Sequence, residues 1–234
     1  MTKDEQLFEL VRLLGSLAHE IKNPLSTIGM NVDLLAEDFA EPRNPVEQRA
    51  LKKIERLQNE CGRLDRILSD FLAFARAPHL ELEPRDLNTL VEETLSLYTP
   101  QAEKAKIDVI TYLAPNLPFV EMNFEAMQSV LLNLLLNAEA AMPEGGQLVI
   151  RTSIEDQAVR LELIDTGCGM DEQTRQKVFQ PFFSTKRGGS GLGLSTAQRV
   201  VLAHGGTIKI ESEPNQGTRF ALSFPMPALL AASK

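Results

Sequence analysis

Glu41-Pro-Arg-Asn-Pro45 is the short stretch that decides how the first third of the chain folds. A proline disfavours helical backbone in the residue before it, so two prolines in five residues end one helix and leave a tight connection before the next. A connection this short places the two flanking helices side by side and antiparallel. The stretch therefore predicts a helical hairpin.

The segments on both sides of this turn carry the spacing of long amphipathic helices. Before the turn, an apolar residue recurs every seven positions and another follows each of them four residues later: Leu7, Val11, Leu14, Ala18, Ile21, Leu25, Ile28, Val32, Leu35 and Phe39. After the turn, apolar residues alternate in steps of three and four, the spacing of a coiled-coil seam: Ile54, Leu57, Cys61, Leu64, Leu68, Phe71 and Ala75. We expect Ala77-Pro78 to end the second helix.

One hairpin has too little core to bury apolar stripes this wide. Two hairpins that form a four-helix bundle would cover them, so we expect a homodimer. The alternative is that the hairpin packs on the rest of its own chain.

Composition restricts the class of protein. The 234 residues are enough for two modest domains, and the formal net charge of −8 gives no electrostatic reason to bind nucleic acid or an anionic membrane. Cys61 and Cys168 have no close partner that would form a CxxC site, which fits a reducing, cytoplasmic setting.

The longest apolar stretch, Val130 to Leu136, is far shorter than the roughly 20 residues that span a bilayer, and the N-terminus lacks the features of a signal peptide. We therefore expect a soluble chain without a membrane segment.

From Asp86 onward, short strands and helices alternate. Strands are predicted at residues 107–113, 147–154, 159–164, 207–211 and 218–224, and helices at 87–98, 124–142 and 193–204. The strands follow one another largely in consecutive pairs rather than in βαβ order, which predicts an α/β sandwich. The expected fold class is α+β: a dimerising helical hairpin in residues 1–80, an α/β sandwich domain in 81–226 and a loose tail in 227–234.

His19 lies on the first predicted helix, away from its seam. Counting Leu14 as heptad position a puts Leu17 at d and His19 at f, so the imidazole faces solvent. Asn23 shares this face one turn later, and Pro24 follows it at a place where a proline costs about 3 kcal/mol. Taken alone, His19 is an ordinary exposed histidine.

Two polar motifs interrupt the second domain. Asn133 and Asn137 share one face of an otherwise apolar helix, which by itself indicates only the wet side of an amphipathic helix. Asp165-Thr-Gly-Cys-Gly-Met170 follows an apolar strand, and its glycines allow the backbone to turn sharply and approach a ligand.

A glycine-rich run, Gly188-Gly-Ser-Gly-Leu-Gly-Leu-Ser195, precedes a predicted helix. Backbone N–H groups at Gly189, Gly191 and Gly193 would lie at the positive end of that helix, which suits phosphate oxygens. A Walker A loop requires Lys-Ser or Lys-Thr after its last glycine, whereas Leu194 follows Gly193 here. A dinucleotide fingerprint would need a glycine where Thr196 stands, so neither of these loops fits.

Together, these motifs resemble those of sensor histidine kinases, in the order found in that family. Ser16-Leu-Ala-His-Glu-Ile-Lys-Asn-Pro-Leu25 is similar to the phosphoacceptor box in its HExxN-P form, and Asn133-Leu-Leu-Leu-Asn137 resembles the asparagine box of the histidine kinase and gyrase type of ATPase. The first glycine box is matched by Asp165–Met170, the phenylalanine box by Phe179–Lys186 and the second glycine box by Gly188–Ser195. The residues of the last two boxes look most like those of the nitrogen-regulation subtype.

The resemblance implies an ATP-dependent protein histidine kinase. His19 would be the nucleophile that attacks the γ-phosphate, and Glu20 would be the general base that accepts its ring proton. Asn23 matches the position that orients water for dephosphorylation of the partner. The implied partners are a second copy of the chain and the receiver domain of a response regulator of the transcription-activator kind, whose aspartate accepts the phosphoryl group.

The resemblance also implies the nucleotide ligands. Asp165 would accept a hydrogen bond from the adenine amino group, Asn137 would ligate Mg²⁺, and Asn133 would lie near the phosphates. Lys186 would add a positive charge toward the γ-phosphate. The other expected nucleotide-binding residues are Gly167, Gly169, Gly189, Gly191, Gly193, Leu194 and Thr218, the last through water.

Two other functions remain open on the sequence alone. A gyrase or chaperone type of ATPase would hydrolyse ATP with a glutamate base, but Asn133 takes the place of that glutamate here. A degenerate kinase would act only as a dimeric scaffold, and the presence of His19, Asn137 and Asp165 argues against it.

Overall fold

The computed structural model describes residues 3–75, 80–186 and 189–226, and it describes the backbone alone for residues 3–20, 66, 70 and 73–75. Gly188, the expected helix end at Ala77-Pro78 and the expected tail at 227–234 lie outside the described residues, as do the side chains of His19 and Glu20. The chain divides into two compact units: the first contains the helical hairpin, and the second contains the sheets and the remaining helices. Across the described ranges, no helix combines the length and the apolar character needed to cross a bilayer.

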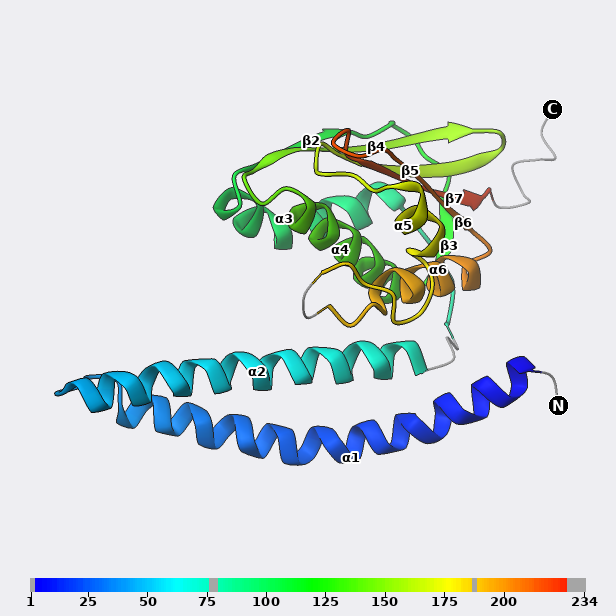
Figure 1. Cartoon of the computed structure of the whole chain (residues 1–234). Coiled ribbons are helices and arrows are strands. Elements are labelled where there is room, and N and C mark those ends of the chain that lie inside the picture. The colour runs from blue at the N-terminus through cyan, green and yellow to red at the C-terminus, as the bar shows by residue number, and fades with distance from the viewer. Residues whose placement is uncertain (1–2, 76–79, 187–188, 227–234) are drawn as a thin grey trace. The chain divides into compact units, whose positions relative to one another are not determined.

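The hairpin consists of α1 (Lys3–Asp38) and α2 (Pro45–Ala75), which lie antiparallel as predicted (Figure 1). Asn44 caps α2: its Oδ1 accepts hydrogen bonds from the amides of Val46 at 2.9 Å and Glu47 at 3.0 Å, and Glu47 Oε2 accepts from the amide of Arg43 at 2.6 Å. Pro45 occupies the first helical position, where its missing N–H costs nothing. The local chemistry of the turn therefore fixes where α2 begins.

Over residues 21–39, the part of α1 and its C-terminal end whose side chains the structure describes, the predicted apolar stripe is only partly buried. Leu25 and Val32 are 9% and 6% exposed, whereas Ile21 and Ile28 are each 53% exposed. Ile21 and Ile28 belong to the apolar residues that recur every seven positions, and the next of these, Leu35, is 44% exposed. The hairpin therefore leaves a row of large apolar side chains along one face of α1.

The second unit is built on a five-stranded sheet. Its strands are β2 (Ile107–Tyr112), β4 (Gly146–Glu155), β5 (Ala158–Asp165), β7 (Thr218–Pro225) and β6 (Thr207–Ser212), in this spatial order. The β2–β4 pair is parallel, and the other three pairs are antiparallel. The β4–β5 and β6–β7 pairs join strands that are consecutive in sequence, as predicted.

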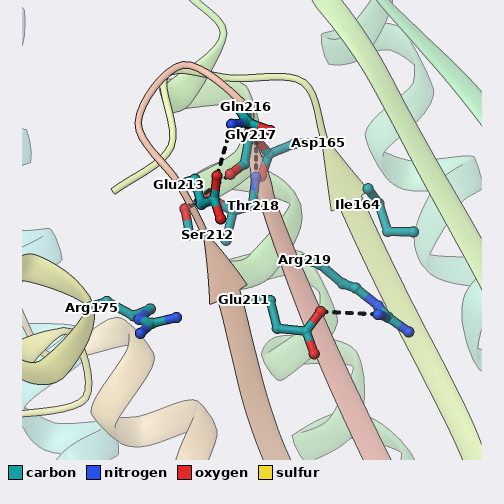
Figure 2. Close-up of a pocket in the computed structure, with 10 residues that line it drawn as sticks. All are labelled: Ile164, Asp165, Arg175, Glu211, Ser212, Glu213, Gln216, Gly217, Thr218 and Arg219. Carbon is teal, nitrogen blue, oxygen red and sulfur yellow. Dashed lines mark hydrogen bonds and ion pairs between the residues drawn. The ribbon is translucent and has the colours of Figure 1, made fainter. Parts of the chain in front are cut away.

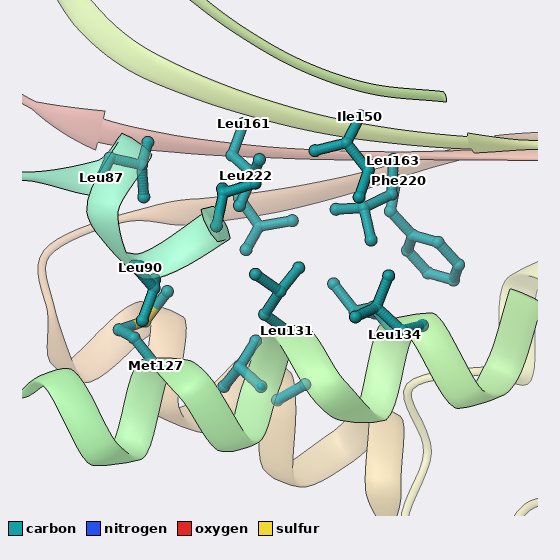
Figure 3. Close-up of a cluster of buried hydrophobic side chains, with 14 of the residues drawn as sticks. Leu87, Leu90, Met127, Leu131, Leu134, Ile150, Leu161, Leu163, Phe220 and Leu222 are labelled. Atoms are coloured by element: carbon teal, nitrogen blue, oxygen red, sulfur yellow. The ribbon is translucent and has the colours of Figure 1, made fainter. Parts of the chain in front are cut away.

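Helices α3 (Leu87–Lys104), α4 (Phe124–Ala141) and α6 (Gly193–Ala203) cover one face of this sheet (Figure 1). Apolar side chains from the sheet and from α3 and α4 meet between the layers, as Figure 3 shows. Those labelled there are Leu87, Leu90, Met127, Leu131, Leu134, Ile150, Leu161, Leu163, Phe220 and Leu222, all of them buried. This core fixes α4 under the strands and so positions the polar residues of α4.

The β4–β5 hairpin has a two-residue turn. Asp156 and Gln157 both adopt positive φ, at 51° and 60°, as a type I′ turn requires. Eight residue pairs follow, from Glu155–Ala158 at the turn to Leu148–Asp165 at the far end. Asp165 therefore lies at the end of the hairpin away from its turn.

Several elements differ from the sequence-based expectation. The helix predicted to end at Tyr98 continues through Pro100 to Lys104, because Tyr98 and Ala102 are both buried and their packing stabilises the last turn. A two-stranded sheet of β1 (Glu83–Arg85) and β3 (Val120–Met122) and the short helix α5 (Glu172–Lys177) were not predicted.

Candidate functional site

Asp165 is a buried carboxylate at the end of β5, with 4% of its surface exposed. Its Oδ1 accepts hydrogen bonds from the amide of Gly167 at 2.9 Å and from the amide of Thr218 at 3.2 Å. Thr218 lies directly opposite Asp165 in the β5–β7 pair and is equally buried. Two backbone donors therefore hold the carboxylate in one orientation.

The turn before β7 closes tightly over Asp165. Gly217 adopts φ +82°, and a Cβ at this position would lie 1.9 Å from the carbonyl oxygen of Asp165, so only glycine fits. Ser212, the last residue of β6, donates its hydroxyl to the Gly217 carbonyl oxygen at 2.9 Å and lies 3.0 Å from Thr218 Oγ1. The turn and the strand ends form one hydrogen-bonded unit.

A cavity of about 400 Å³ opens beside this unit. It is lined by residues of β5, β6, β7, the turn between β6 and β7, and α5: Ile164, Asp165, Arg175, Glu211, Ser212, Glu213, Gln216, Gly217, Thr218 and Arg219. Figure 2 shows Asp165, Ser212 and Thr218 gathered at the turn, with Arg219 and Glu211 paired farther along the strands. The lining combines the Asp165 carboxylate and the Thr218 hydroxyl with a charged rim made of Arg175, Glu211, Glu213 and Arg219.

Arg219 on this rim is held by two carboxylates. It pairs with the buried Glu162 and, at 3.0 Å, with Glu211. The hydrogen bond to Glu162 is the main cause that raises the pKa of Arg219 above its ordinary value, and burial opposes it. These pairs offset the charge of Arg219 next to the cavity.

The two asparagines of α4 are joined to each other and to α6. The amide nitrogen of Asn137 donates to Asn133 Oδ1 at 3.0 Å. Gly193 is the first residue of α6, and a Cβ there would lie 2.7 Å from Asn133 Oδ1 and 2.8 Å from Asn133 Nδ2. The absence of a side chain at Gly193 therefore lets the N-terminus of α6 lie directly against Asn133.

His204 ties the opposite ends of these two helices together. Its Nδ1 lies 2.7 Å from the carbonyl oxygen of Val200 in α6, and its Nε2 lies 2.9 Å from the amide nitrogen of Asn123, which caps α4. A carbonyl only accepts and an amide only donates, so the hydrogen sits on Nδ1 and Nε2 is the acceptor. His204 thus fixes α6 relative to the start of α4.

The loop after β5 is anchored at both sides. The amide of Cys168 donates to the carbonyl oxygen of Ala141, at the end of α4, at 3.0 Å. The carbonyl oxygen of Cys168 accepts from the amide of Asn215, in the turn before β7, at 2.7 Å. Gly167 and Gly169 flank this residue, so the structure brings them together with Asp165 and Thr218.

The other expected nucleotide residues lie before or in α6. Lys186 and Gly189 are exposed, Gly191 is half-buried, and Leu194 is the second residue of α6. The Lys186 amide donates to Ser184 Oγ at 3.1 Å, and the Gly189 amide donates to the Lys186 carbonyl oxygen at 3.3 Å. Leu194 is not among the residues that line the cavity beside Asp165.

On the hairpin, the backbone of His19 and Glu20 belongs to α1, and Asn23 is exposed one turn later. Lys22, next to Asn23, donates to Ser69 Oγ of α2 at 3.0 Å and lies 3.5 Å from Asp65 Oδ1. This pair of contacts fixes α1 against α2 at the level of the phosphoacceptor motif.

Ser212 and His204 were not assigned to the site from the sequence. Ser212 reaches Thr218 only through the pairing of β6 with β7, and no motif signals that register. The contacts of the His204 imidazole join segments 81 residues apart, which no local pattern signals.

Two family models match the chain. The His Kinase A (phospho-acceptor) domain matches residues 9–80, and the histidine kinase-, DNA gyrase B- and HSP90-like ATPase domain matches residues 122–228. The first covers the hairpin motif of His19, and the second covers Asn133, Asp165 and Thr218.

The chain is similar to the signal transduction histidine-protein kinase AtoS of Escherichia coli strain K12. The two are 35% identical over 229 residues, which are 97% of this chain and 36% of AtoS. The chain therefore spans about a third of the length of that relative.

Solved structures of histidine kinases share the fold. Full-length ShkA in complex with AMPPNP matches with a TM-score of 0.71 and 27% identity, over 91% of this chain and 45% of ShkA. The catalytic domain of histidine kinase ThkA matches with a TM-score of 0.57 and 32% identity, over 62% of this chain and 95% of that domain. ThkA in complex with the response regulator protein TrrA matches with a TM-score of 0.68 and 28% identity, over 96% of this chain and 64% of that ThkA chain.

Proposed function

Since the chain belongs to the histidine kinase family, we propose that it transfers the γ-phosphoryl group of ATP to its own His19 and then to an aspartate of a response regulator. The proposal rests on one observation above all: the N-terminus of α6 lies against Asn133 of α4, in the domain that also buries Asp165 beside Thr218. A helix N-terminus attracts phosphate oxygens, and a buried carboxylate attracts a base with an amino group. One domain thus carries groups for both ends of ATP.

In the proposed reaction, one ring nitrogen of His19 attacks the γ-phosphorus in line with the bond to the β-phosphate. The new P–N bond forms as the P–O bond breaks, ADP leaves, and Glu20 accepts the proton of the ring. A receiver aspartate then attacks the phosphohistidine, which forms an aspartyl phosphate and restores the imidazole. Positioning and neutralisation of charge supply most of the rate.

The nucleotide would bind with its base at Asp165 and Thr218 and its phosphates toward Asn133 and the start of α6. The glycines at 167, 169, 189, 191 and 193, together with Leu194, would bring backbone close to the nucleotide. Lys186 would place its ammonium toward the γ-phosphate. The similarity to ShkA, solved with AMPPNP, supports binding of ATP.

The donor set of α4 fits Mg²⁺ held mainly by ATP. Asn137 donates its amide nitrogen to Asn133, and the side-chain carbonyl oxygen of an asparagine is a suitable hard ligand for Mg²⁺. Among the side chains that the structure describes, no group of three or more His, Cys, Asp or Glu could hold a metal alone. Mg²⁺ usually keeps several waters and binds through one or two side chains plus substrate phosphates, and it would neutralise phosphate charge here.

We further propose that the hairpin, residues 1–80, dimerises and that residues 81–226 form the catalytic domain. The exposed row of Ile21, Ile28 and Leu35 supports a four-helix bundle, because a second hairpin would remove these side chains from water. The similarity to ThkA, solved with TrrA, supports a response regulator as the partner. We also propose that the protein acts in the cytoplasm, where the thiols of Cys61 and Cys168 would stay reduced.

Incubation with γ-labelled ATP and Mg²⁺ tests the kinase reaction. We expect acid-labile label on the chain, none on His19→Gln, and equal binding of AMPPNP by both proteins. Labelling should stop in EDTA and return when Mg²⁺ is added in excess. Free phosphate without labelled protein would instead indicate an ATPase, and neither product would indicate a scaffold.

A further inference from the structure

Ser212, Thr218 and Asp165 form one transverse row across three strands. In the observed register, Ser212 of β6 lies directly opposite Thr218 of β7, and Thr218 lies directly opposite Asp165 of β5. Directly opposed residues of antiparallel strands point to the same face of the sheet. All three also line the cavity in Figure 2. Thr218 lies on the strand between the other two, so Ser212 contacts Thr218 on the side away from Asp165.

The hydrogen bonds of this row fix which atom carries each hydrogen. Ser212 Oγ lies 2.9 Å from the Gly217 carbonyl oxygen, which can only accept, so the single hydroxyl hydrogen of Ser212 is used there. Ser212 Oγ also lies 3.0 Å from Thr218 Oγ1. Since Ser212 has no second hydrogen, Thr218 is the donor in this contact, and its hydroxyl offers only lone pairs to any other group.

We infer that Ser212 is a positioning residue that sets base specificity by holding the Thr218 hydroxyl as an acceptor, an inference that rests on the proposed nucleotide-binding function. With Thr218 held in this way, both it and the Asp165 carboxylate present acceptors. They suit the 6-amino edge of adenine, reached directly or through a water that donates to Thr218. A 6-oxo purine presents an acceptor at the same place and leaves these groups unpaired.

The test is a double-mutant cycle on the whole chain, with AMPPNP affinity measured by calorimetry for the unmodified protein, Ser212→Ala, Thr218→Val and the double variant. Ser212→Ala should weaken AMPPNP binding about three- to tenfold, the range expected for one neutral hydrogen bond. In the Thr218→Val background the same substitution should change affinity less than about twofold, because the hydroxyl that Ser212 orients is gone.

The inosine counterpart of AMPPNP, which has a 6-oxo group, provides the second measurement. Ser212→Ala should narrow the preference for AMPPNP over this probe, since a released Thr218 hydroxyl can turn and donate to the oxo group. Ser212→Thr keeps the hydroxyl and should keep both affinity and preference. The control is Ser223→Ala, which lies on the same strand as Thr218 but on the other face of the sheet. This variant should change neither the AMPPNP affinity nor the preference between the two probes.

Equal losses from Ser212→Ala in both backgrounds would show that Ser212 only supports the turn at Gly217, and this would overturn the inference. An unchanged preference between the two probes would overturn it as well. If the unmodified chain binds neither probe, the proposed function itself fails. These results are distinguishable, because the first two require tight AMPPNP binding by the unmodified protein.

Discussion

Replacing Asp165 with asparagine separates its role in folding from its proposed role in base recognition. The side-chain oxygen of the introduced asparagine would still accept the two backbone hydrogen bonds that Oδ1 of Asp165 accepts at 2.9 and 3.2 Å. The amide NH₂ would instead bring a donor toward the amino group of adenine. Loss of a hydrogen bond to a charged group costs about 1.5–3 kcal/mol, so we expect AMPPNP affinity to fall roughly 10- to 150-fold with little change in the melting temperature.

The matched control is Asp165→Ala, which removes the acceptor entirely. The amides of Gly167 and Thr218 are both buried, and each would lose its partner at a cost of about 1–3 kcal/mol. We expect a fall of about 2–6 kcal/mol in the free energy of unfolding of the catalytic domain, in addition to the loss of binding. Calorimetry and thermal unfolding on one preparation decide the matter: unaltered AMPPNP affinity in Asp165→Asn would refute base recognition by this residue.

Three further substitutions probe other parts of the chain. Asn23→Ala should keep autophosphorylation at His19 and slow dephosphorylation of the regulator, and equal losses in kinase rate, phosphatase rate and melting temperature would refute the water-orienting role. Gly193→Val should weaken AMPPNP binding at least tenfold, because its side chain must displace Asn133, which would lie 2.7 Å from the first added carbon; calorimetry that shows unchanged affinity would contradict this contact. Ile28→Asp should shift the chain from dimer to monomer in sedimentation, since it places a charge in the exposed row of α1; a dimer that persists unchanged would place the interface elsewhere.

Elements with a repeated apolar pattern could be predicted from the sequence. The five strands of the large sheet and the three helices that cover it are predictable because their buried faces recur at the strand or helix period. The turn before α2 is predictable because prolines such as Pro45 end a helix whatever the tertiary context.

The missed elements carry no such pattern. Helix α5 has six residues and no buried side chain, so it shows no apolar face. Strands β1 and β3 have three residues each, which is too short for an alternation, and Pro84 sits in the middle of one of them. Their pairing depends on tertiary packing that no local signal reveals.

In the candidate site too, some residues can be predicted from a local pattern and others cannot. Asp165 and Gly193 belong to motifs that can be read from the order of residues. The contacts of Ser212 with Thr218 and of His204 with Asn123 arise from strand register and helix packing, and they join residues 6 and 81 positions apart. The sequence therefore indicates which groups meet a ligand more readily than which groups hold them in place.

The two-residue turn at Asp156 and Gln157 has a consequence for the order of folding. Hairpins with such turns close within about 1–10 μs, and pairing then proceeds outward from the turn. The parallel β2–β4 pair joins Ile107 to Gly146 across α4, so it must await closure of a much longer loop. Asp165 sits at the end of the hairpin that pairs last, and the amides of Gly167 and Thr218 donate to its side chain there, so their hydrogen exchange should report local opening of that end. A nucleotide that binds only the closed form would slow this exchange in proportion to its concentration above Kd, so protection at the end of β5 reports occupancy without any turnover.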